Sequence, residues 1–222
     1  MFVKLCGLRT IEDARGAIAA EASALGFILA ESKRQVTPEF VARVREEIPN
    51  PPTIVGVTVN LSPYENTQIF KQARLDMLQL SGDEGTEILY ELDMPLIKSL
   101  RFPEGTTVDA ACAEVDAWLN HAHAPEIVMV DGAPAGQYGG TGHRADARLV
   151  GEISVRYPIV LAGGLNPDNV ADAIRQFNPV GVDTASGTEF DGTKSLEKMK
   201  AFVTNARDAW LGTQSTLTPG LR

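Results

Sequence analysis

Cys6 and Asp131 are well suited to proton transfer, because each ends a short apolar run that predicts a strand. Cys6 ends the run 2–6, and its thiol fits three roles: a buried structural group, a nucleophile or a general base. Asp131 ends the run 126–131, and its carboxylate could cap a loop or act as a general acid or base. Facing each other across one pocket, they would form a two-sided proton-transfer site.

The stretch 159–189 contains two strand, turn and helix units whose turns could hold an anion. The first strand ends at two glycines, and the second runs into a turn of small and hydroxyl residues. Glycines let the backbone approach a ligand closely, and N–H groups in such turns bind phosphate oxygens. One such turn alone fits an ordinary capped loop as well, but two in tandem favour a phosphate site. The predicted contacts are Gly163, Gly164, Ser186 and Gly187.

Other polar or small residues near predicted strand ends and turns are candidates for substrate binding. A guanidinium can pair with a carboxylate, and amide and hydroxyl groups form hydrogen bonds. For the arginine, an ordinary solvated loop charge is the alternative. These candidates are Arg34, Gln79, Ser81, Gly140 and Asp183.

Composition excludes several classes of function. The formal charge of −9 at pH 7 argues against nucleic-acid binding and against attraction to an anionic membrane. No apolar run approaches the ~20 residues that span a bilayer. The 2 cysteines and 3 histidines show no metal-ligand spacing, so we predict no metal. The N-terminal residues lack the apolar core of a signal peptide, which predicts a cytoplasmic protein with free thiols.

The elements that must position these residues alternate between short apolar strands and helical segments. We predict strands at 2–6, 24–30, 53–59, 76–80, 95–100, 126–131, 159–162 and 180–183, with a helix after each. Eight such repeats fit a closed (β/α)8 TIM barrel with parallel strands better than an open doubly wound sheet. We expect one barrel domain over residues 1–210 and a flexible tail over 211–222.

Barrel geometry groups the candidates, because reacting side chains lie at the carboxyl ends of the strands. Phosphate sites in such barrels often follow the seventh and eighth strands, which is where the two anion turns lie. An open nucleotide-binding sheet would carry its Gly-rich turn after the first strand. The GxGxxG/A match here, at 140–145, instead follows the sixth strand, so we interpret it as coincidence.

A series of motifs, in order over nearly the whole chain, resembles phosphoribosylanthranilate isomerase of tryptophan biosynthesis. The KxCG start, the AGGLNPxNV run and the GVDxxSGxE run are specific, whereas GGTG is weak. The motifs are Lys4-Leu5-Cys6-Gly7, Gly26-Phe27-Ile28, Ser32-Lys33-Arg34-Gln35-Val36, Val57-Thr58-Val59-Asn60, Gln79-Leu80-Ser81-Gly82-Asp83-Glu84, Gly139-Gly140-Thr141-Gly142, 161–170 and 181–189.

The resemblance implies an Amadori rearrangement of N-(5-phosphoribosyl)anthranilate to the aminodeoxyribulose phosphate, without a cofactor. Asp131 matches the general acid that opens the ribose ring, and Cys6 matches the general base that removes the C2 proton. The base would need a lowered pKa. Arg34 matches the residue that pairs with the anthranilate carboxylate. A small phosphoribosyl substrate and a monomer or homodimer are expected.

The chain departs from the family pattern at three places. Ser81 stands where histidine is usual, Arg34 is flanked by Lys33 and Gln35 rather than Pro and Tyr, and the aromatic segment after GGTG is replaced at 144–147. These changes affect the anthranilate pocket, while the glycines of loop 132–143 permit closure as a lid. Two alternatives are a related ribose-phosphate barrel enzyme, such as a bifunctional histidine/tryptophan isomerase or an epimerase, and a non-catalytic phosphosugar-binding barrel.

Overall fold

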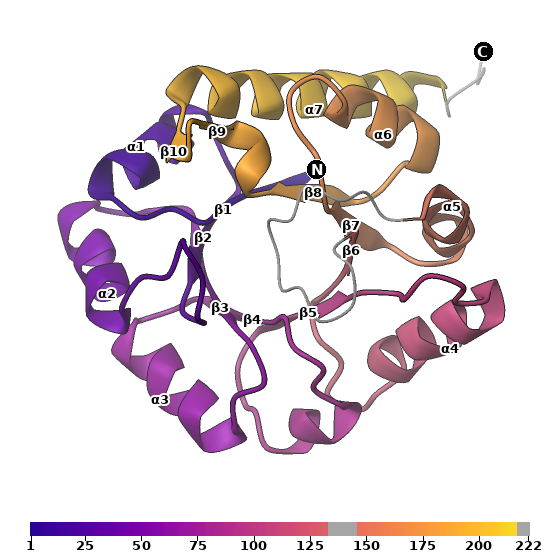
Figure 1. Cartoon of the computed structure of the whole chain (residues 1–222), viewed down its shortest axis with the longest axis horizontal. Coiled ribbons are helices and arrows are strands. Elements are labelled where there is room, and N and C mark those ends of the chain that lie inside the picture. The colour runs from indigo at the N-terminus through magenta and orange to yellow at the C-terminus, as the bar shows by residue number, and fades with distance from the viewer. Residues whose placement is uncertain (133–145, 217–222) are drawn as a thin grey trace, which may run out of the picture.

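The computed structural model describes residues 1–132 and 146–216. Within them, eight parallel strands close into a barrel, in which each strand pairs with the next and β8 pairs with β1 (Figure 1). The predicted (β/α)8 barrel is therefore confirmed. The strands are β1 (Phe2–Cys6), β2 (Ala24–Ile28), β3 (Thr53–Thr58), β4 (Met77–Leu80), β5 (Leu96–Leu100), β6 (Ile127–Asp131), β7 (Ile159–Ala162) and β8 (Gly181–Thr184).

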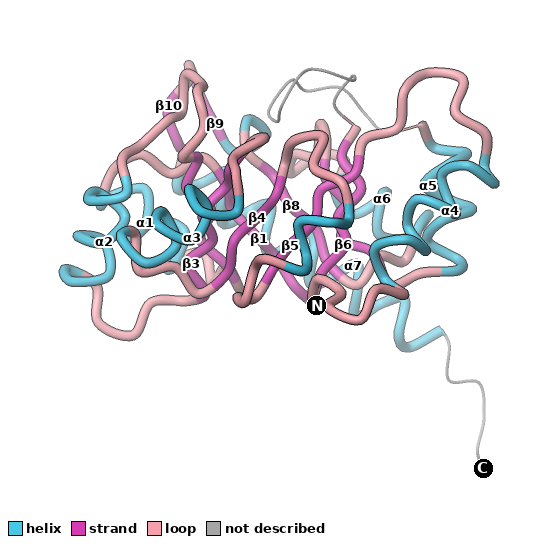
Figure 2. Tube along the Cα trace, turned by 90° about the horizontal axis from the view of Figure 1, so that it is seen from below, coloured by secondary structure: helices cyan, strands magenta, loops and turns pink. Residues whose placement is uncertain are grey.

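Helices surround the barrel and cover the outer faces of the strands (Figure 1). Seen from the side, the strands form the centre of the molecule and the helices form its rim (Figure 2). The α-helices are α1 (Ile11–Ala19), α2 (Pro38–Glu47), α3 (Pro63–Gln72), α4 (Val108–Leu119), α5 (Ala147–Arg156), α6 (Val170–Phe177) and α7 (Leu196–Thr216).

Side-chain caps fix where several helices begin. Thr10 accepts a hydrogen bond from the Asp13 amide at 2.9 Å, and Asp13 accepts one from the Thr10 amide in return. Ser62 and Glu65 form the same reciprocal pair at the start of α3. Each cap satisfies N–H groups that the first turn leaves free, so the chain enters the helix soon after leaving its strand.

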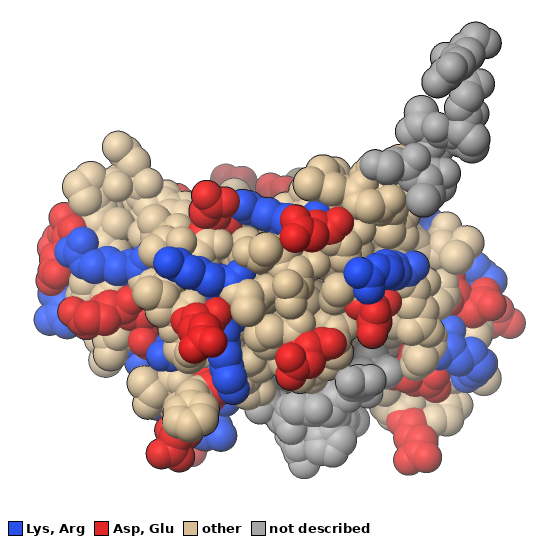
Figure 3. All heavy atoms as spheres, turned by 90° about the horizontal axis from the view of Figure 1, so that it is seen from above, with Lys and Arg blue, Asp and Glu red and all other residues tan. Residues whose placement is uncertain are grey.

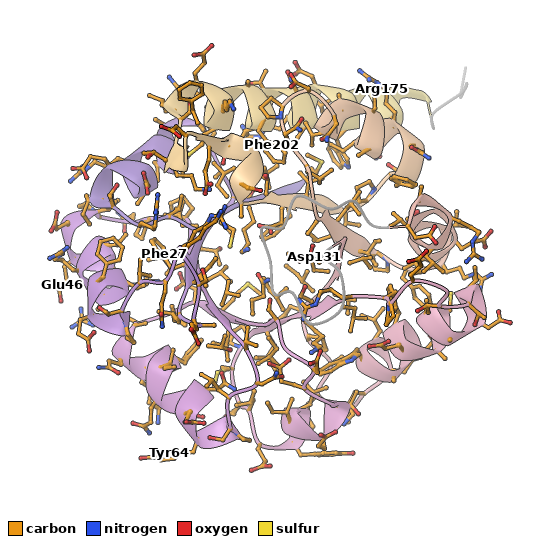
Figure 4. All side chains as sticks on the ribbon, viewed as in Figure 1. Phe27, Glu46, Tyr64, Asp131, Arg175 and Phe202 are labelled. Carbon is orange, nitrogen blue, oxygen red and sulfur yellow. The ribbon has the colours of Figure 1, made fainter. Side chains whose placement is uncertain are left out.

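Apolar side chains form two cores, because successive residues of a strand point to opposite faces of the sheet. The inner core fills the barrel with side chains such as Val55, Ile97 and Val160. The larger outer core lies between the strands and the helices and includes Phe27 and Phe202, which Figure 4 shows outside the ring of strands. The strands are thus apolar on both faces, as their near-continuous apolar runs indicate.

Three segments differ from the prediction. Thr86–Tyr90 forms a 3-10 helix rather than an α-helix. A two-stranded ribbon, β9 (Glu189–Phe190) and β10 (Thr193–Lys194), separates β8 from α7, where the sequence predicted a direct step from turn to helix. Helix α7 also continues to Thr216, into the segment that we expected to be a tail.

Charged side chains of both signs are interspersed on the face of the molecule drawn in Figure 3. The sequence carries 20 basic and 29 acidic residues. In the described ranges, none of the helices combines the length and the apolar character that crossing a membrane requires.

Candidate active site

Polar side chains gather inside the barrel at the end where the strands terminate. Cys6, Gln79, Asp131 and Asp183 continue inward-facing rows that begin with apolar residues near the strand starts. Figure 4 shows Asp131 within the ring of strands. These side chains line a pocket that encloses about 690 Å³, including its open mouth. Of the predicted site residues, the pocket wall contains Cys6, Gln79, Ser81, Asp131, Gly163, Gly164, Asp183 and Ser186.

Cys6 lies at the closed end of this pocket and is 5% exposed. It pairs in register with Gly26 of β2, and a Cβ at Gly26 would lie 2.7 Å from the Cys6 Sγ, so the glycine makes room for the thiol. Burial raises the pKa of Cys6, and the nearby positive charge of Lys4 opposes part of that rise. The described residues therefore do not supply the lowered pKa that the sequence analysis expected, because desolvation outweighs the attraction to lysine.

Beneath Cys6 lies a buried ion pair between Lys4 and Asp183. The Lys4 Nζ donates to the Asp183 Oδ1 at 2.9 Å, and the lysine side chain is fully buried. Burial by itself lowers the pKa of Lys4, but the negative charges of Asp183 and Cys6 outweigh it, so this pKa lies above its ordinary value. The pair joins β1 to β8 and places a fixed positive charge next to the thiol.

The turn after β7 brings glycine backbone to the pocket wall. Gly163 and Gly164 have φ angles of +91° and +63°, which glycine adopts without the strain that a side chain would add. A Cβ at Gly163 would lie 2.7 Å from the Gly132 Cα and 3.0 Å from the Asp131 Oδ1. Asn169 braces the turn, since its Nδ2 donates to the Gly164 carbonyl at 3.0 Å. The first anion turn therefore packs directly against the candidate acid.

The turn after β8 is bonded to the first. The Thr184 hydroxyl donates to the Leu165 carbonyl at 2.7 Å, and Gly187 packs so closely on this carbonyl that any side chain there would overlap it. Lys194 donates to the Ala185 carbonyl at 2.6 Å. The two turns thus form one rigid wall, in which Ser186 lines the pocket and Gly187 serves the packing.

Gln79 and Ser81 form a polar pair on another side of the pocket. The Gln79 Nε2 donates to the Ser81 Oγ at 2.9 Å, and both residues are buried. The Gln79 Oε1 is buried and has no hydrogen-bond partner among the described residues. A buried acceptor is costly to leave unsatisfied, so this atom is a candidate contact for a hydroxyl or amino group of a ligand.

Arg34 is held by a carboxylate of the protein. Its Nε and Nη2 donate to the two carboxylate oxygens of Glu189 at 2.6 and 2.9 Å. It packs over Gly7, where a Cβ would lie 2.7 Å from the Arg34 Cδ. Arg34 is buried beside the pocket, whereas Glu31 and Ser32 of the same loop line it. Gly140, the GGTG motif and most of the predicted lid 132–143 lie outside the described residues.

Sequence reasoning did not select Lys4, Lys194 or Glu189 for the site. Signals for Lys4 and Glu189 were present: Lys4 precedes Cys6 by two positions on one strand, so both side chains must point the same way, and Glu189 ends the GVDxxSGxE run. Lys194 carried no signal, since its contact with the Ala185 turn depends on the ribbon β9–β10.

A sequence model of the family described as N-(5'-phosphoribosyl)anthranilate (PRA) isomerase matches residues 3–205. The chain belongs to the N-(5'-phosphoribosyl)anthranilate isomerase family. The predicted resemblance is thereby confirmed. The isomerase of Dehalococcoides mccartyi is 35% identical over 209 residues, which cover 93% of this chain and 95% of the relative. That of Roseiflexus castenholzii is 38% identical over 94% of this chain and 99% of the relative.

Solved structures of the isomerase family share the fold. The Thermotoga maritima isomerase superposes with a TM-score of 0.79 at 31% identity, covering 94% of this chain and 99% of its own. A phosphoribosyl anthranilate isomerase in complex with reduced 1-(o-carboxyphenylamino)-1-deoxyribulose 5-phosphate superposes with a TM-score of 0.76 at 30% identity, with the same coverage of both chains.

Proposed function

We propose that this chain catalyses the Amadori rearrangement of N-(5'-phosphoribosyl)anthranilate in tryptophan biosynthesis, with Cys6 as general base and Asp131 as general acid. One feature of the barrel carries the proposal. The strands β7 and β8 lie between β6, which ends in Asp131, and β1, which ends in Cys6. The two anion turns follow β7 and β8. A phosphate bound there leaves the ribose between the acid and the base.

The proposed reaction begins at the ribose ring. Asp131 donates a proton to the ring oxygen, the C1–O bond breaks, and the nitrogen lone pair forms a C1=N bond. The Cys6 thiolate then takes the C2 proton, and the C2–H electrons form a C1=C2 bond as the C1=N electrons return to nitrogen. The resulting enolamine gains a proton at C1 and loses one from the C2 hydroxyl to give the ketone. The reaction therefore requires that Asp131 is protonated and that Cys6 is ionised.

Binding of the substrate uses the fixed wall and the buried polar groups. The turns around Gly163, Gly164 and Ser186 hold the phosphate, since glycine backbone and a hydroxyl meet it without reorganising. Gln79 accepts a hydrogen bond from the substrate through its Oε1. Glu189 occupies the Nε–H and one N–H of Nη2 of Arg34, so the N–H groups of Nη1 and the second N–H of Nη2 are those that can bind the anthranilate carboxylate.

A fluorescence assay tests the reaction. Purified protein is mixed with N-(5'-phosphoribosyl)anthranilate, and the loss of anthranilate-type fluorescence is followed over time. We expect turnover well above the uncatalysed background, and a Cys6→Ser/Asp131→Asn double variant serves as the enzyme blank. A rate equal to that of the blank contradicts the proposal.

The assembly and the cellular location are further parts of the proposal. The Thermotoga maritima isomerase is described as dimeric, and monomers of it have been generated. We infer a monomer or homodimer for this chain of 23.9 kDa, and sedimentation equilibrium would distinguish them. Membership of a family of biosynthetic enzymes supports a cytoplasmic location, which imaging of the tagged full chain in the cell would test.

A further inference from the structure

We propose that Lys4 is a positioning residue that stabilises the Cys6 thiolate, and that Asp183 limits this effect by partly neutralising the charge of the lysine. The proposal rests on the proposed function, because it assigns to Lys4 the control of the base in that reaction. Lys4, Cys6 and Asp183 lie next to one another inside the barrel. Lys4 and Cys6 share the inner face of β1, and Asp183 pairs with Lys4 from β8.

Geometry limits what else the lysine can do. Lys4 is fully buried, and its Nζ gives one hydrogen bond, at 2.9 Å, to Asp183. An ammonium group carries three donors. Because Cys6 lies on the same face two residues further along the strand, toward the pocket, its sulfur is where a second N–H can act. Asp183 alone would balance the charge of a buried lysine, so charge balance does not require a thiol nearby. The observation that points to catalysis is the position of Lys4 beneath Cys6 on the same face of β1.

The charges around Cys6 differ in sign and in distance from the reaction. Lys4 on β1, Lys194 on β10 and Arg34 in the loop after β2 are positive, whereas Asp183 on β8 is negative, and Asp131, the proposed acid on β6, lines the same pocket. Arg34 is neutralised by Glu189, and Lys194 is held by the Ala185 carbonyl and lies 3.6 Å from Glu189. Of these cations, Lys4 is therefore the one whose charge acts most directly on the Cys6 thiol.

Replacing Lys4 and replacing Asp183 should shift the ionisation of the Cys6 thiol in opposite directions. Replacing Lys4 removes the charge that favours the thiolate, so the thiol should ionise at higher pH. Replacing Asp183 removes a negative charge that opposes the thiolate and frees the lysine, so the thiol should ionise at lower pH. An ion pair that does not act on Cys6 would leave the ionisation of the thiol unchanged in both variants.

The test is a pH titration of Cys6 by the ultraviolet absorbance of its thiolate, in a Cys112→Ala background that leaves Cys6 as the sole thiol. We expect the midpoint to rise by about one pH unit or more in Lys4→Met and to fall in Asp183→Asn. In an Asp131→Asn background, the acid limb of the residual kcat/KM profile should move in the same directions. The matched control is Lys98→Met, which breaks another buried ion pair, with Glu84, on the outer side of β5. It should leave the Cys6 midpoint in place.

A folded Lys4→Met protein that titrates as the parent overturns the proposal, as does an upward or absent shift in Asp183→Asn. Circular dichroism and thermal melting show which variants are folded. If Lys4→Met does not fold, the titration of Cys6 in Asp183→Asn alone tests the proposal. The titration uses no substrate. Lack of turnover therefore contradicts the proposed function alone, whereas unshifted midpoints contradict the role of Lys4 alone.

Discussion

Cys6 and Asp131 carry the proton transfers of the proposed reaction, so their removal should act on the chemical step. Cys6→Ser and Asp131→Asn should each lower kcat by roughly 10²- to 10⁴-fold and leave substrate binding nearly unchanged. Steady-state kinetics and a binding measurement with a substrate analogue check both halves of this prediction. Cys112→Ala is the control, because that buried thiol lies on α4 in the outer core. A near-normal rate in Cys6→Ser would remove it as the base.

The pKa of Cys6 sets the pH dependence of the reaction. Cys6 acts as a base only when ionised and Asp131 as an acid only when protonated, so in an Asp131→Asn background the residual kcat/KM should rise with pH until the thiol is fully deprotonated. Burial raises this pKa above its ordinary value despite Lys4. The rise should therefore continue beyond about pH 8.5, the ordinary value for a thiol. A profile that is already flat at neutral pH contradicts this account.

The turn after β7 depends on a glycine at Gly163 for two reasons, its φ of +91° and its contact with Gly132. Gly163→Ala should lower the free energy of unfolding by more than the ~1 kcal/mol typical of alanine at a positive φ, and should raise KM. Urea unfolding and kinetics measure the two effects.

Gly105 supplies the matched control for this turn. Its φ is +85°, but among the described residues no atom beyond its two chain neighbours lies within 4 Å of a Cβ built there. Gly105→Ala should show only the cost of the backbone conformation, with unchanged KM. Equal losses in both variants would mean that the close approach to Gly132 does not matter.

The loop after β2 and the ribbon β9–β10 are joined by the Arg34–Glu189 pair. Arg34→Met leaves a buried carboxylate with only Lys194 nearby, and should lower the free energy of unfolding by about 3 kcal/mol. Arg175→Met is the control, because it breaks an exposed pair with Asp172 and should change the unfolding free energy by less than ~0.5 kcal/mol. Urea unfolding measures both, and similar values would show that Arg34 is not fixed by its partner.

At the scale of the whole molecule, the alternation of apolar runs and helical segments was sufficient to predict the barrel. The predicted carboxyl ends of the strands agree with the structure at Cys6, Leu80, Leu100, Asp131 and Ala162. The order of the strands around the ring then followed, because short right-handed crossovers place each strand beside the previous one. The same periodicity brought most predicted site residues into one pocket.

The remaining features depend on contacts that local sequence does not encode. The ribbon β9–β10 consists of two strands of two residues each, too short for any periodic signal. The 3-10 helix Thr86–Tyr90 has the apolar spacing of an α-helix, so spacing alone does not distinguish the two. The bond between Arg34 and Glu189 spans 155 positions, so only the closed barrel shows that the arginine already has a carboxylate partner.

The ion pair between Lys4 and Asp183 joins residues 179 positions apart, on the first and last strands of the barrel. During synthesis the N-terminal strand leaves the ribosome long before Asp183 is made, since chains emerge from their N-terminus. Until the ring closes, Lys4 stays in water and its charge is screened from Cys6. The charged environment of the cysteine thus cannot form before the eighth strand joins the ring, and a chain that ends before Asp183 carries only an ordinary thiol.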